Sequence, residues 1–536
     1  MNSKLTALAA AIMVAAATGA QTPKRDFKRD IRLSASNLLA YPGPDNSRKM
    51  TPAPDSLKPF YISHYGRHGS RFLIDPEDYA EPLATLHRAD SMGKLTLRGR
   101  DLMRRISWMQ AEADGRLGEL TEIGARQHRG IARRIYERFP EVFAPGAHID
   151  ARSTVVIRCI LSMENELMEL VRLNPALNVS HDASQHDMVY MNFANTAPTP
   201  SAWTPEAREA MRQLYDSMVD TVKVMRRLFS DMDYAREHVG MRRLNDQLFR
   251  LASATQNSDA RYKVTLYDVF DDNDIYANWV CNNAGWYLGY ACSPINGGRQ
   301  PLTQRNLLNN IINEADSCIR LAGTGASLRF GHETVLLPLV CLMGLDGYGM
   351  STDDLRHLDR KGWIDYKIFP MGSNVQIVFY RKDASDTDPV VKVLLNENEA
   401  KLPIKAVSGP YYRWSDVRGY WLERMATMGK ATTADADCRC RGTAARRPQT
   451  PRRSHACSRG RRTKETDCHT RPCNTPGNRA WRSVSYYTGR PATSTGHAFL
   501  HWVCMVKRWP PTAGGAHPDS RNKGMAGPCH LTSLSV

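Results

Sequence analysis

The last part of the sequence lacks the residues that build a protein core. Residues 431–536 contain no isoleucine, and leucine, valine and phenylalanine together occur only eight times. A segment of this composition cannot bury enough apolar surface to form a globular domain. We consider three explanations: a basic disordered tail, an arm that binds nucleic acid or a surface, and out-of-frame translation after a frameshift. We favour the frameshift, because the composition changes abruptly and no repeat or aromatic-basic rhythm follows.

The rest of the chain lacks an excess of charge of either sign. The whole sequence has a formal net charge of +17. Residues 431–536 contribute 18 Lys and Arg against 5 Asp and Glu, which leaves 54 against 50 for residues 1–430. The body of the chain is therefore nearly balanced. The total charge gives no support to a nucleic-acid partner, and we predict none.

Long apolar runs are also missing beyond the N-terminus. Met1–Lys4 is short and basic, Leu5–Ala17 is apolar but too short to span a bilayer, and Thr18–Ala20 supplies small residues. This order predicts a signal peptide over residues 1–20. The alternative is an N-terminal helix of the fold. We therefore expect a periplasmic or secreted protein with no membrane partner after cleavage, and the sequence indicates no oligomeric state.

Cysteine is scarce in residues 1–430. These residues contain five cysteines, which can form at most two disulfides and leave one thiol free. We expect Cys281 and Cys292 to be the first pair to test. The five cysteines are Cys159, Cys281, Cys292, Cys318 and Cys341.

One stretch combines groups that suit phosphate chemistry. The apolar run Phe60–Ile62 predicts a short buried strand, and Gly66–Arg71 follows with the sequence GRHGSR. Arginine presents a fixed fork of donors that matches phosphate oxygens, and glycine lets the backbone approach a ligand closely. Repulsion from Arg67 and Arg71 favours the neutral form of His68, which makes it a nucleophile rather than an acid. The alternative is a solvated basic turn.

The pattern of elements predicts an α/β fold with the glycine loop at the carboxyl edge of the sheet. Residues 166–300 contain few strand patterns, and we predict that they form a mostly helical cap inserted into a core of residues 21–165 and 301–430. Within the cap, the apolar periodicity of residues 203–229 predicts one long helix. Other helices are predicted over 77–92, 95–113, 121–139 with Thr121 as N-cap, and 414–425, and further strands over 326–330, 375–379 and 390–395.

Two further features lie far from the glycine loop in the sequence. His332-Glu333 follows a predicted strand and begins a predicted helix. Taken alone, this pair is more typical of helix capping and of a favourable charge at a helix N-terminus. Arg152 precedes Arg158 in an R-S-T…R-C…S pattern. A lone arginine is usually a surface charge.

Together and in this order, the three features resemble the histidine phosphatase superfamily, in its branch of acid phosphatases and phytases, over most of residues 59–425. The resemblance implies a Rossmann-like α/β/α core with the inserted helical cap. In Gly331–Thr334 this chain has glutamate after the histidine, where many acid phosphatases have aspartate. In this respect the motif resembles that of the multiple inositol polyphosphate phosphatase group, including its bacterial secreted members. The phosphate pocket implied by the resemblance comprises Arg67, Arg71, Arg152 and His332.

The resemblance also implies a two-step reaction. His68 attacks phosphorus to give a phosphohistidine, and Glu333 protonates the leaving oxygen. Glu333 then acts as the base for the water that hydrolyses the intermediate. Guanidinium and imidazolium groups neutralise the phosphate oxygens, so we expect no metal or other cofactor.

We therefore predict a phytase-like histidine acid phosphatase, a phosphoric monoester hydrolase whose partner is a small-molecule phosphate ester such as phytate. One alternative is a broad-specificity acid phosphatase on sugar or aryl phosphates. Another is a non-catalytic, anion-binding product of a damaged gene. Basic cap residues near the pocket would favour the polyphosphate substrate, although for each a solvated helix face is the commoner explanation. The candidates by charge are Arg226, Arg227, Arg242, Arg243 and Lys263.

Overall fold

The computed structural model describes residues 23–47, 49–191 and 201–442, with side chains up to residue 429. The predicted signal peptide and most of the anomalous tail lie outside these residues. The described residues all belong to one compact unit of the chain. Within them, no helix combines the length and the apolar character that a membrane crossing requires.

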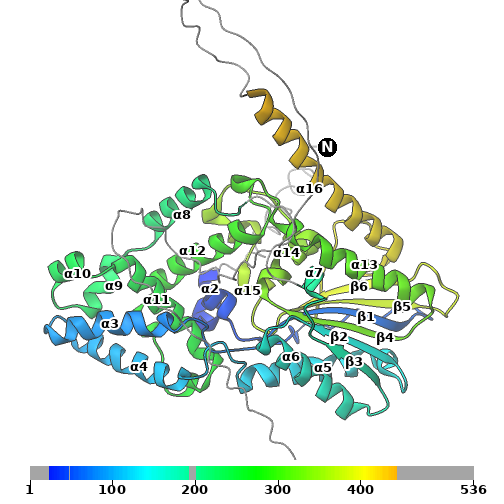
Figure 1. Ribbon diagram of the computed structural model, residues 1–536, viewed down its shortest axis with the longest axis horizontal. Coiled ribbons are helices and arrows are strands. Elements are labelled where there is room, and N and C mark those ends of the chain that lie inside the picture. The colour runs from blue at the N-terminus through cyan, green and yellow to red at the C-terminus, as the bar shows by residue number, and fades with distance from the viewer. Residues whose placement is uncertain (1–22, 48, 192–200, 443–536) are drawn as a thin grey trace, which may run out of the picture. The chain divides into compact units, whose positions relative to one another are not determined.

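A mixed sheet forms the centre of the α/β part (Figure 1). The strand order is β3-β2-β4-β1-β5-β6-β7, and β8 pairs with β6. Strands β3, β2, β4 and β1 run parallel to one another, whereas β5 runs antiparallel to β1. The predicted α/β fold is thus confirmed. The strands are β1 Lys58–Arg67, β2 His148–Ser153, β3 Asn178–Asp182, β4 Gly325–Gly331, β5 Asn374–Arg381, β6 Val390–Leu395, β7 Asn398–Glu399 and β8 Tyr412–Arg413.

Helices cover both faces of the sheet (Figure 1). Helices α5 and α6 pack together on one face, and α6 contacts β2 and β4. Helices α13 and α14 contact β1 from the other face. Side chains alternate along β1 accordingly, since Ile62 joins the core beneath α5 and α6 while Tyr61 and Tyr65 join the larger core. These helices are α5 Glu122–Arg138, α6 Ile157–Leu173, α13 Arg305–Arg320 and α14 Glu333–Met343.

A second group of helices lies beside the sheet layers, at the left of Figure 1. Helix α3 packs against α11, and α4 packs against α9, so two helices from the predicted core segment contact helices of the predicted cap. The division into core and cap stays a prediction. The remaining α-helices of the described residues, of which α7 and α16 lie near the sheet, are α2 Pro23–Arg29, α3 Glu77–Ser91, α4 Leu97–Ala113, α7 Met188–Met191, α8 Pro205–Met218, α9 Thr221–Leu228, α10 Met232–His238, α11 Met241–Ala254, α12 Asp272–Tyr290, α15 Asp365–Ile368 and α16 Trp414–Gly442.

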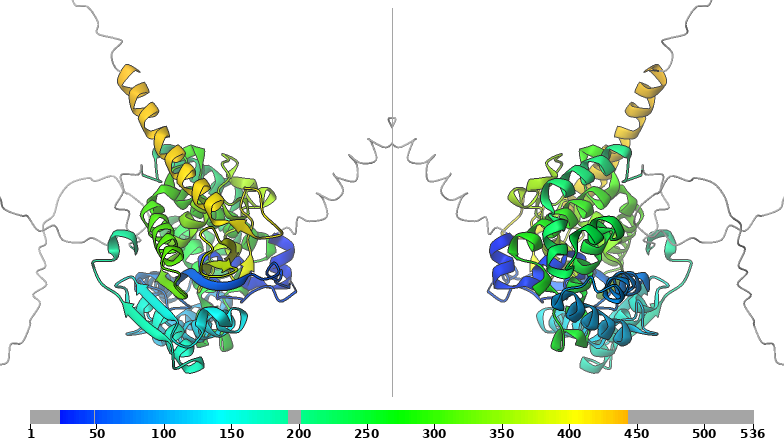
Figure 2. Two further views of the ribbon diagram at one scale, coloured as in Figure 1. Left: turned by 90° about the vertical axis from the view of Figure 1, so that its right-hand side faces the viewer. Right: turned by 90° about the vertical axis from the view of Figure 1, so that its left-hand side faces the viewer.

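The structure corrects two of the predicted helices. Residues 203–229 form two helices, α8 and α9, instead of one. Val219 is extended after α8, and the Asp220 side chain accepts a hydrogen bond from the backbone N–H of Lys223, which starts a new helix. The final helix α16, yellow to orange in Figure 2, ends at Gly442 rather than at Met425.

The predicted disulfide is wrong, because Cys281 and Cys292 are both free and buried. Cys281 lies in the middle of α12, and Cys292 follows its end. The stretch of helix between Cys281 and Tyr290 rises about 13 Å. A disulfide needs Cα atoms within about 7 Å of each other. All five cysteines of the body are free thiols.

Candidate active site

The glycine loop follows the carboxyl end of β1 and lies beside the end of β4. Arg67 is opposite Gly331 in the parallel pairing of these strands. The backbone N–H of His68 donates to the Gly331 carbonyl at 2.9 Å, and the His68 carbonyl accepts from the N–H of Gly372 at 2.9 Å. Since His332 directly follows Gly331, strand pairing alone brings the two histidine motifs together.

Glycine is required where the loop approaches helix α5. A Cβ atom on Gly69 would lie 2.6 Å from the Gly124 backbone, and one on Gly124 would lie 2.3 Å from the Ser70 carbonyl oxygen. No side chain fits at either position without moving the backbone. The loop is also held from α6, because the Gly69 N–H donates to the Ser162 hydroxyl at 3.1 Å.

The His68 ring is buried and oriented by its own loop. Its Nδ1 lies 2.9 Å from the Gly69 carbonyl oxygen. A carbonyl only accepts, so Nδ1 carries the proton and the lone pair is on Nε2. Nε2 lies 3.6 Å from Oε2 of Glu333. Burial, together with the charges of Arg158 and Arg67, holds the pKa of His68 well below its usual value, although Glu333 opposes the shift. The geometry therefore gives a neutral imidazole whose Nε2 lone pair is buried and has no hydrogen-bond donor within the described residues.

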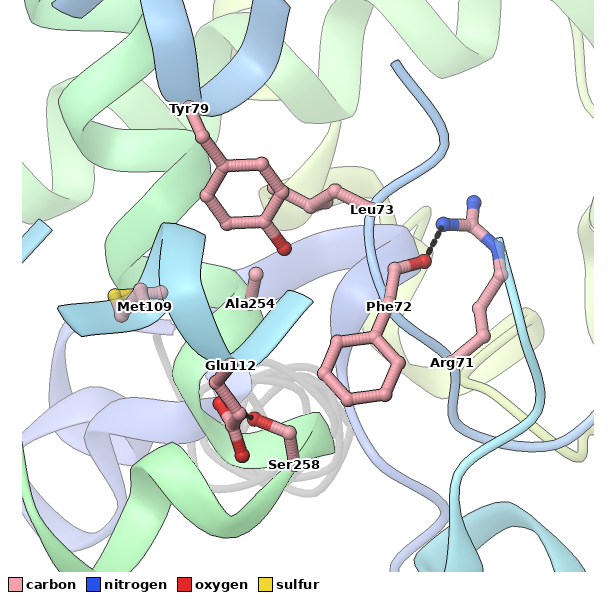
Figure 3. A pocket seen from close by; sticks show the side chains of 8 residues that line it. All are labelled: Arg71, Phe72, Leu73, Tyr79, Met109, Glu112, Ala254 and Ser258. Atoms are coloured by element: carbon pink, nitrogen blue, oxygen red, sulfur yellow. Dashed lines mark hydrogen bonds between the residues drawn. The ribbon is translucent and has the colours of Figure 1, made fainter. Parts of the chain in front are cut away.

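Arg67 and Arg71 extend from the two ends of the same loop. Arg67 is fully buried, and its Nη1 donates to the carbonyls of Asn37 and Phe369, both at 2.7 Å. Arg71 donates to the Phe72 carbonyl at 2.9 Å and forms one wall of a small cavity (Figure 3). Burial and the charge of Arg158 lower the pKa of Arg71 to about 9. Both guanidinium groups remain charged at acidic and neutral pH.

Arg158, on the first turn of α6, completes a cluster of three guanidinium groups. It is the strongest charge that lowers the pKa of His332, ahead of Arg67 and Arg71. Within the described residues, Nη2 of Arg67, Nε of Arg71 and Nε of Arg158 are buried without a hydrogen-bond partner. Buried donors are almost always paired in folded proteins. Three such groups beside one histidine are suited to bind an anion with several oxygens.

The structure places Arg152 elsewhere. Its Nη2 lies 2.8 Å from Asp150, and its Nε lies 3.6 Å from Asp187. Arg152 is inside strand β2, where neighbouring carboxylates satisfy it, whereas Arg158 lies beyond the strand end at the edge where ligands bind. We therefore propose Arg158 in place of Arg152 as the third arginine of the pocket. The sequence signal was present, because both arginines belong to the same R-S-T…R-C…S pattern.

His332 and Glu333 begin helix α14. His332 is extended at the N-cap position, and Glu333 is the first helical residue. The His332 N–H donates to the Tyr65 hydroxyl at 3.1 Å. The His332 and His68 rings lie edge to face with centroids 5.6 Å apart. Burial and the nearby guanidinium groups lower the pKa of His332 to about 3.

The Glu333 carboxylate contacts both Arg67 and His68. Its Oε2 is 2.9 Å from Nε of Arg67, and its Oε1 accepts a long hydrogen bond of 3.5 Å from the Asn37 amide. Burial alone would raise the pKa of Glu333, but Arg67, His68 and Arg71 together hold it well below its usual value. Asn37 belongs to the polar segment before β1, and nothing in the sequence pattern marked it as part of the site.

The comparisons with known proteins agree with this geometry. Residues 67–396 match the family model of the histidine phosphatase superfamily (branch 2), which is more than half of the chain. The chain belongs to this superfamily. A search of curated proteins finds no match.

Solved structures share the fold of this histidine phosphatase. The Bifidobacterium longum multiple inositol polyphosphate phosphatase in complex with inositol hexasulfate is 18% identical with a TM-score of 0.61, and the match covers 72% of this chain and 96% of that one. The phytase from D. castellii is 14% identical with a TM-score of 0.52, covering 74% of this chain and 85% of that one. At these identities the likeness shows the fold alone.

The cations of the predicted cap that were considered from the sequence mostly contact neighbouring carboxylates or aromatic rings. Arg227 forms ion pairs with Asp271 and Asp274, and Arg243 pairs with Glu81. Arg242 stacks over the Tyr215 ring, Lys263 lies over the Trp108 ring, and Arg226 is exposed. Arg250 on α11 is different, because its charge is among those that lower the pKa of Arg71.

Proposed function

We propose that this histidine phosphatase hydrolyses phosphate monoesters, with inositol polyphosphates such as phytate as its substrates, through a phosphohistidine on His68. The observation that carries the proposal is the neutral His68 ring, whose free Nε2 lies between a carboxylate and buried arginines with unpaired donors. Such a site holds a phosphoryl group and presents a nucleophile to its phosphorus.

In the first step the Nε2 lone pair attacks phosphorus, and the bond from phosphorus to the ester oxygen breaks. Arg67, Arg71, Arg158 and His332 surround the phosphoryl oxygens on which charge develops. An inositol alkoxide is a poor leaving group, so Glu333 gives it a proton. In the second step water attacks phosphorus, Glu333 accepts the proton from the water, and the nitrogen–phosphorus bond breaks to release inorganic phosphate.

The low pKa of Glu333 in the free protein suits the second step better than the first. Bound phosphate groups bring negative charge beside the carboxylate, and this charge favours its protonated form. We therefore expect Glu333 to take up its proton together with the substrate, and the rate to be highest at acidic to neutral pH.

The inositol polyphosphate substrate is supported by two observations. The solved structure from B. longum carries the name of a multiple inositol polyphosphate phosphatase and contains inositol hexasulfate. In this chain, Arg250 pairs with Asp78 at 2.8 Å and its charge still acts on Arg71. The ion pairs of Arg227 with Asp274 and of Arg243 with Glu81 favour the second candidate, a broad-specificity acid phosphatase, because these arginines add no free charge to the pocket.

Phosphate release from the full chain tests both candidates. Phytate, phenyl phosphate and a sugar phosphate are supplied at several pH values, with the His68→Ala variant as control. Release that depends on His68 and has the highest kcat/KM for phytate supports the proposal. Equal kcat/KM for all three esters favours the broad-specificity phosphatase, and phosphate binding without release favours a non-catalytic, anion-binding protein.

A further inference from the structure

Asn37 contacts two residues of the proposed reaction, although it lies about 30 residues before the glycine loop and far from helix α14 in the sequence. It belongs to the 3-10 segment Ile31–Leu38. Its backbone carbonyl accepts from Nη1 of Arg67 at 2.7 Å, and its side-chain Nδ2 donates to Oε1 of Glu333 at 3.5 Å. One residue therefore fixes the arginine through its backbone and contacts the carboxylate through its side chain.

The chain around Asn37 is fixed on both sides. Ser36, the preceding residue, has φ 55° and ψ −125°, a conformation that residues with a side chain rarely adopt. Its hydroxyl donates to the buried Asp365 carboxylate at 2.5 Å. On the other side, the Leu38 carbonyl accepts from Nδ2 of Asn257 at 2.7 Å. An unfavourable backbone conformation held by buried hydrogen bonds indicates that the position of Asn37 is specified by the fold.

The same network reaches the glycine loop. Oδ1 of Asn257 accepts from the Ser70 hydroxyl at 2.7 Å, so Ser70 is linked to Leu38 through a single amide side chain. The Leu39 carbonyl also accepts from the Met371 N–H at 2.8 Å. The segment that carries Asn37 is thus tied to the loop that carries His68, and their relative position is rigid.

The two oxygens of Glu333 have different partners. Oε2 faces Nε of Arg67 at 2.9 Å and Nε2 of His68 at 3.6 Å, whereas Oε1 accepts from Asn37. In a neutral carboxyl group the carbonyl oxygen is the better acceptor. The Arg67 N–H at Oε2 favours Oε2 as the acceptor, and the Asn37 amide at Oε1 opposes this by shifting the balance toward the form in which Oε1 is the carbonyl and Oε2 carries the proton.

We propose that Asn37 is a positioning residue that directs the proton of Glu333 to Oε2, on the side where His68 receives the phosphoryl group. This inference rests on the proposed function. The Asn37 amide also favours the ionised carboxylate by donating to it, so it helps to keep the pKa of Glu333 low. Asn37 takes no part in bond formation, and its effect depends on how much the reaction needs a proton donor.

The test compares substrates that differ in their leaving group. An alkyl phosphate needs the proton from Glu333, whereas p-nitrophenyl phosphate leaves readily without one. In Asn37→Ala, we expect kcat/KM for the alkyl ester to fall about 10-fold or more, a part of the usual 10²- to 10⁴-fold effect of a general acid. For p-nitrophenyl phosphate, kcat/KM stays within about twofold.

The pH profile gives a second readout that a purely structural role does not change. Removing the amide donor raises the pKa of Glu333, so the alkaline limb of kcat/KM for the alkyl ester moves to higher pH in Asn37→Ala. Asn37→Asp has nearly the same shape but adds a negative charge, so the limb moves further in the same direction. The isosteric variant retains the test if the alanine variant does not fold.

Ser34→Ala is the matched control. Ser34 lies in the same 3-10 segment, and its hydroxyl bonds to the Ile31 carbonyl and the Tyr267 hydroxyl without contacting Glu333 or Arg67. Ser34→Ala should lower the melting temperature. It should leave unchanged both the ratio of kcat/KM for the two esters and the alkaline limb of the pH profile. Equal loss on both esters in the Asn37 variants, with an unmoved limb, overturns the inference while the proposed function stands. An inactive wild-type protein overturns both.

Discussion

Arginines around His68 and arginines on the cap helices share one side chain but differ in their surroundings. Arg67, Arg71 and Arg158 are placed beside two histidines, and each keeps a buried N–H group without a hydrogen bond within the described residues. Arg227 and Arg243 have carboxylate partners at 2.5 to 3.0 Å. Carboxylates neutralise Arg227 and Arg243, whereas the site arginines have Glu333 beside Arg67 and still keep buried N–H groups that can bind an anion.

The largest difference in kcat/KM is expected between the alanine variants of Arg67 and Arg227. Arg67→Ala removes a charge from the phosphoryl oxygens and the ion pair of Glu333, so we expect kcat/KM for phytate to fall about 10³-fold. Arg227→Ala breaks ion pairs within the cap, so the melting temperature falls by a few degrees and kcat/KM changes less than about twofold. Steady-state kinetics and thermal unfolding of both variants measure the difference. Equal kinetic losses would show that the distinction between the two groups is false.

Arg158 and Arg152 are a closer pair, since they lie six positions apart in one sequence pattern. Arg158→Ala should lower kcat/KM about 100-fold, because its charge acts directly on His332 and His68. Arg152→Ala should lose only the ion pairs with Asp150 and Asp187 and keep kcat/KM within about twofold. Phosphate-release kinetics under one condition suffice. The opposite order of effects would restore Arg152 to the pocket.

Arg250 shares a property with each group of arginines. It has a carboxylate partner, Asp78 at 2.8 Å, and its charge also lowers the pKa of Arg71. We expect a second phosphate of a polyphosphate to contact Arg250, a contact that a substrate with a single phosphate cannot make. In Arg250→Ala we expect KM for phytate to rise about fivefold, with KM for phenyl phosphate unchanged. Arg243→Ala is the matched cap control and should change neither value. An equal rise for both esters would remove Arg250 as a contact for polyphosphates.

The smallest expected effect is the change of kcat/KM when the pH is lowered through 6.5. Burial and the neighbouring arginines hold the pKa of His68 well below 6.5, so the nucleophile stays neutral when the pH falls through 6.5. The wild-type pH profile of kcat/KM should therefore show no protonation step near pH 6.5. In Arg67→Lys the charge is kept, so the profile keeps its position while the rate falls. A wild-type acidic limb with a pKa of 6 to 7 would contradict the described surroundings of His68.

The sequence predicted the parts of the site that follow strand ends. His68 and His332 come after two apolar runs that are adjacent parallel strands in the structure, so local patterns were enough to place them together. The sequence pattern did not distinguish Arg152 from Arg158, because it does not tell where a strand ends. Asn37 was missed because its role depends on a long-range contact with Glu333 from an irregular segment.

For the fold, too, features set by local sequence were predicted and features set by long-range packing were missed. Thr121 was identified as an N-cap, and its side chain accepts from the Gly124 N–H, because capping is local chemistry. The break between α8 and α9 was missed, since the apolar periodicity continues across Val219 while Asp220 starts a new helix. The packing of α3 and α4 against helices of the predicted cap was also missed. Apolar periodicity shows which face of a helix is buried but not which element covers it.

The central claim is that His68 carries the phosphoryl group and that Glu333 is needed to release it. The most direct measurement uses Glu333→Gln with p-nitrophenyl phosphate in a rapid-quench experiment. We predict a burst of p-nitrophenol close to one equivalent and an acid-labile, alkali-stable phosphoryl label on His68, because the good leaving group departs while hydrolysis lacks its base. Absence of a burst, with no label on His68 in a folded protein, would contradict the account.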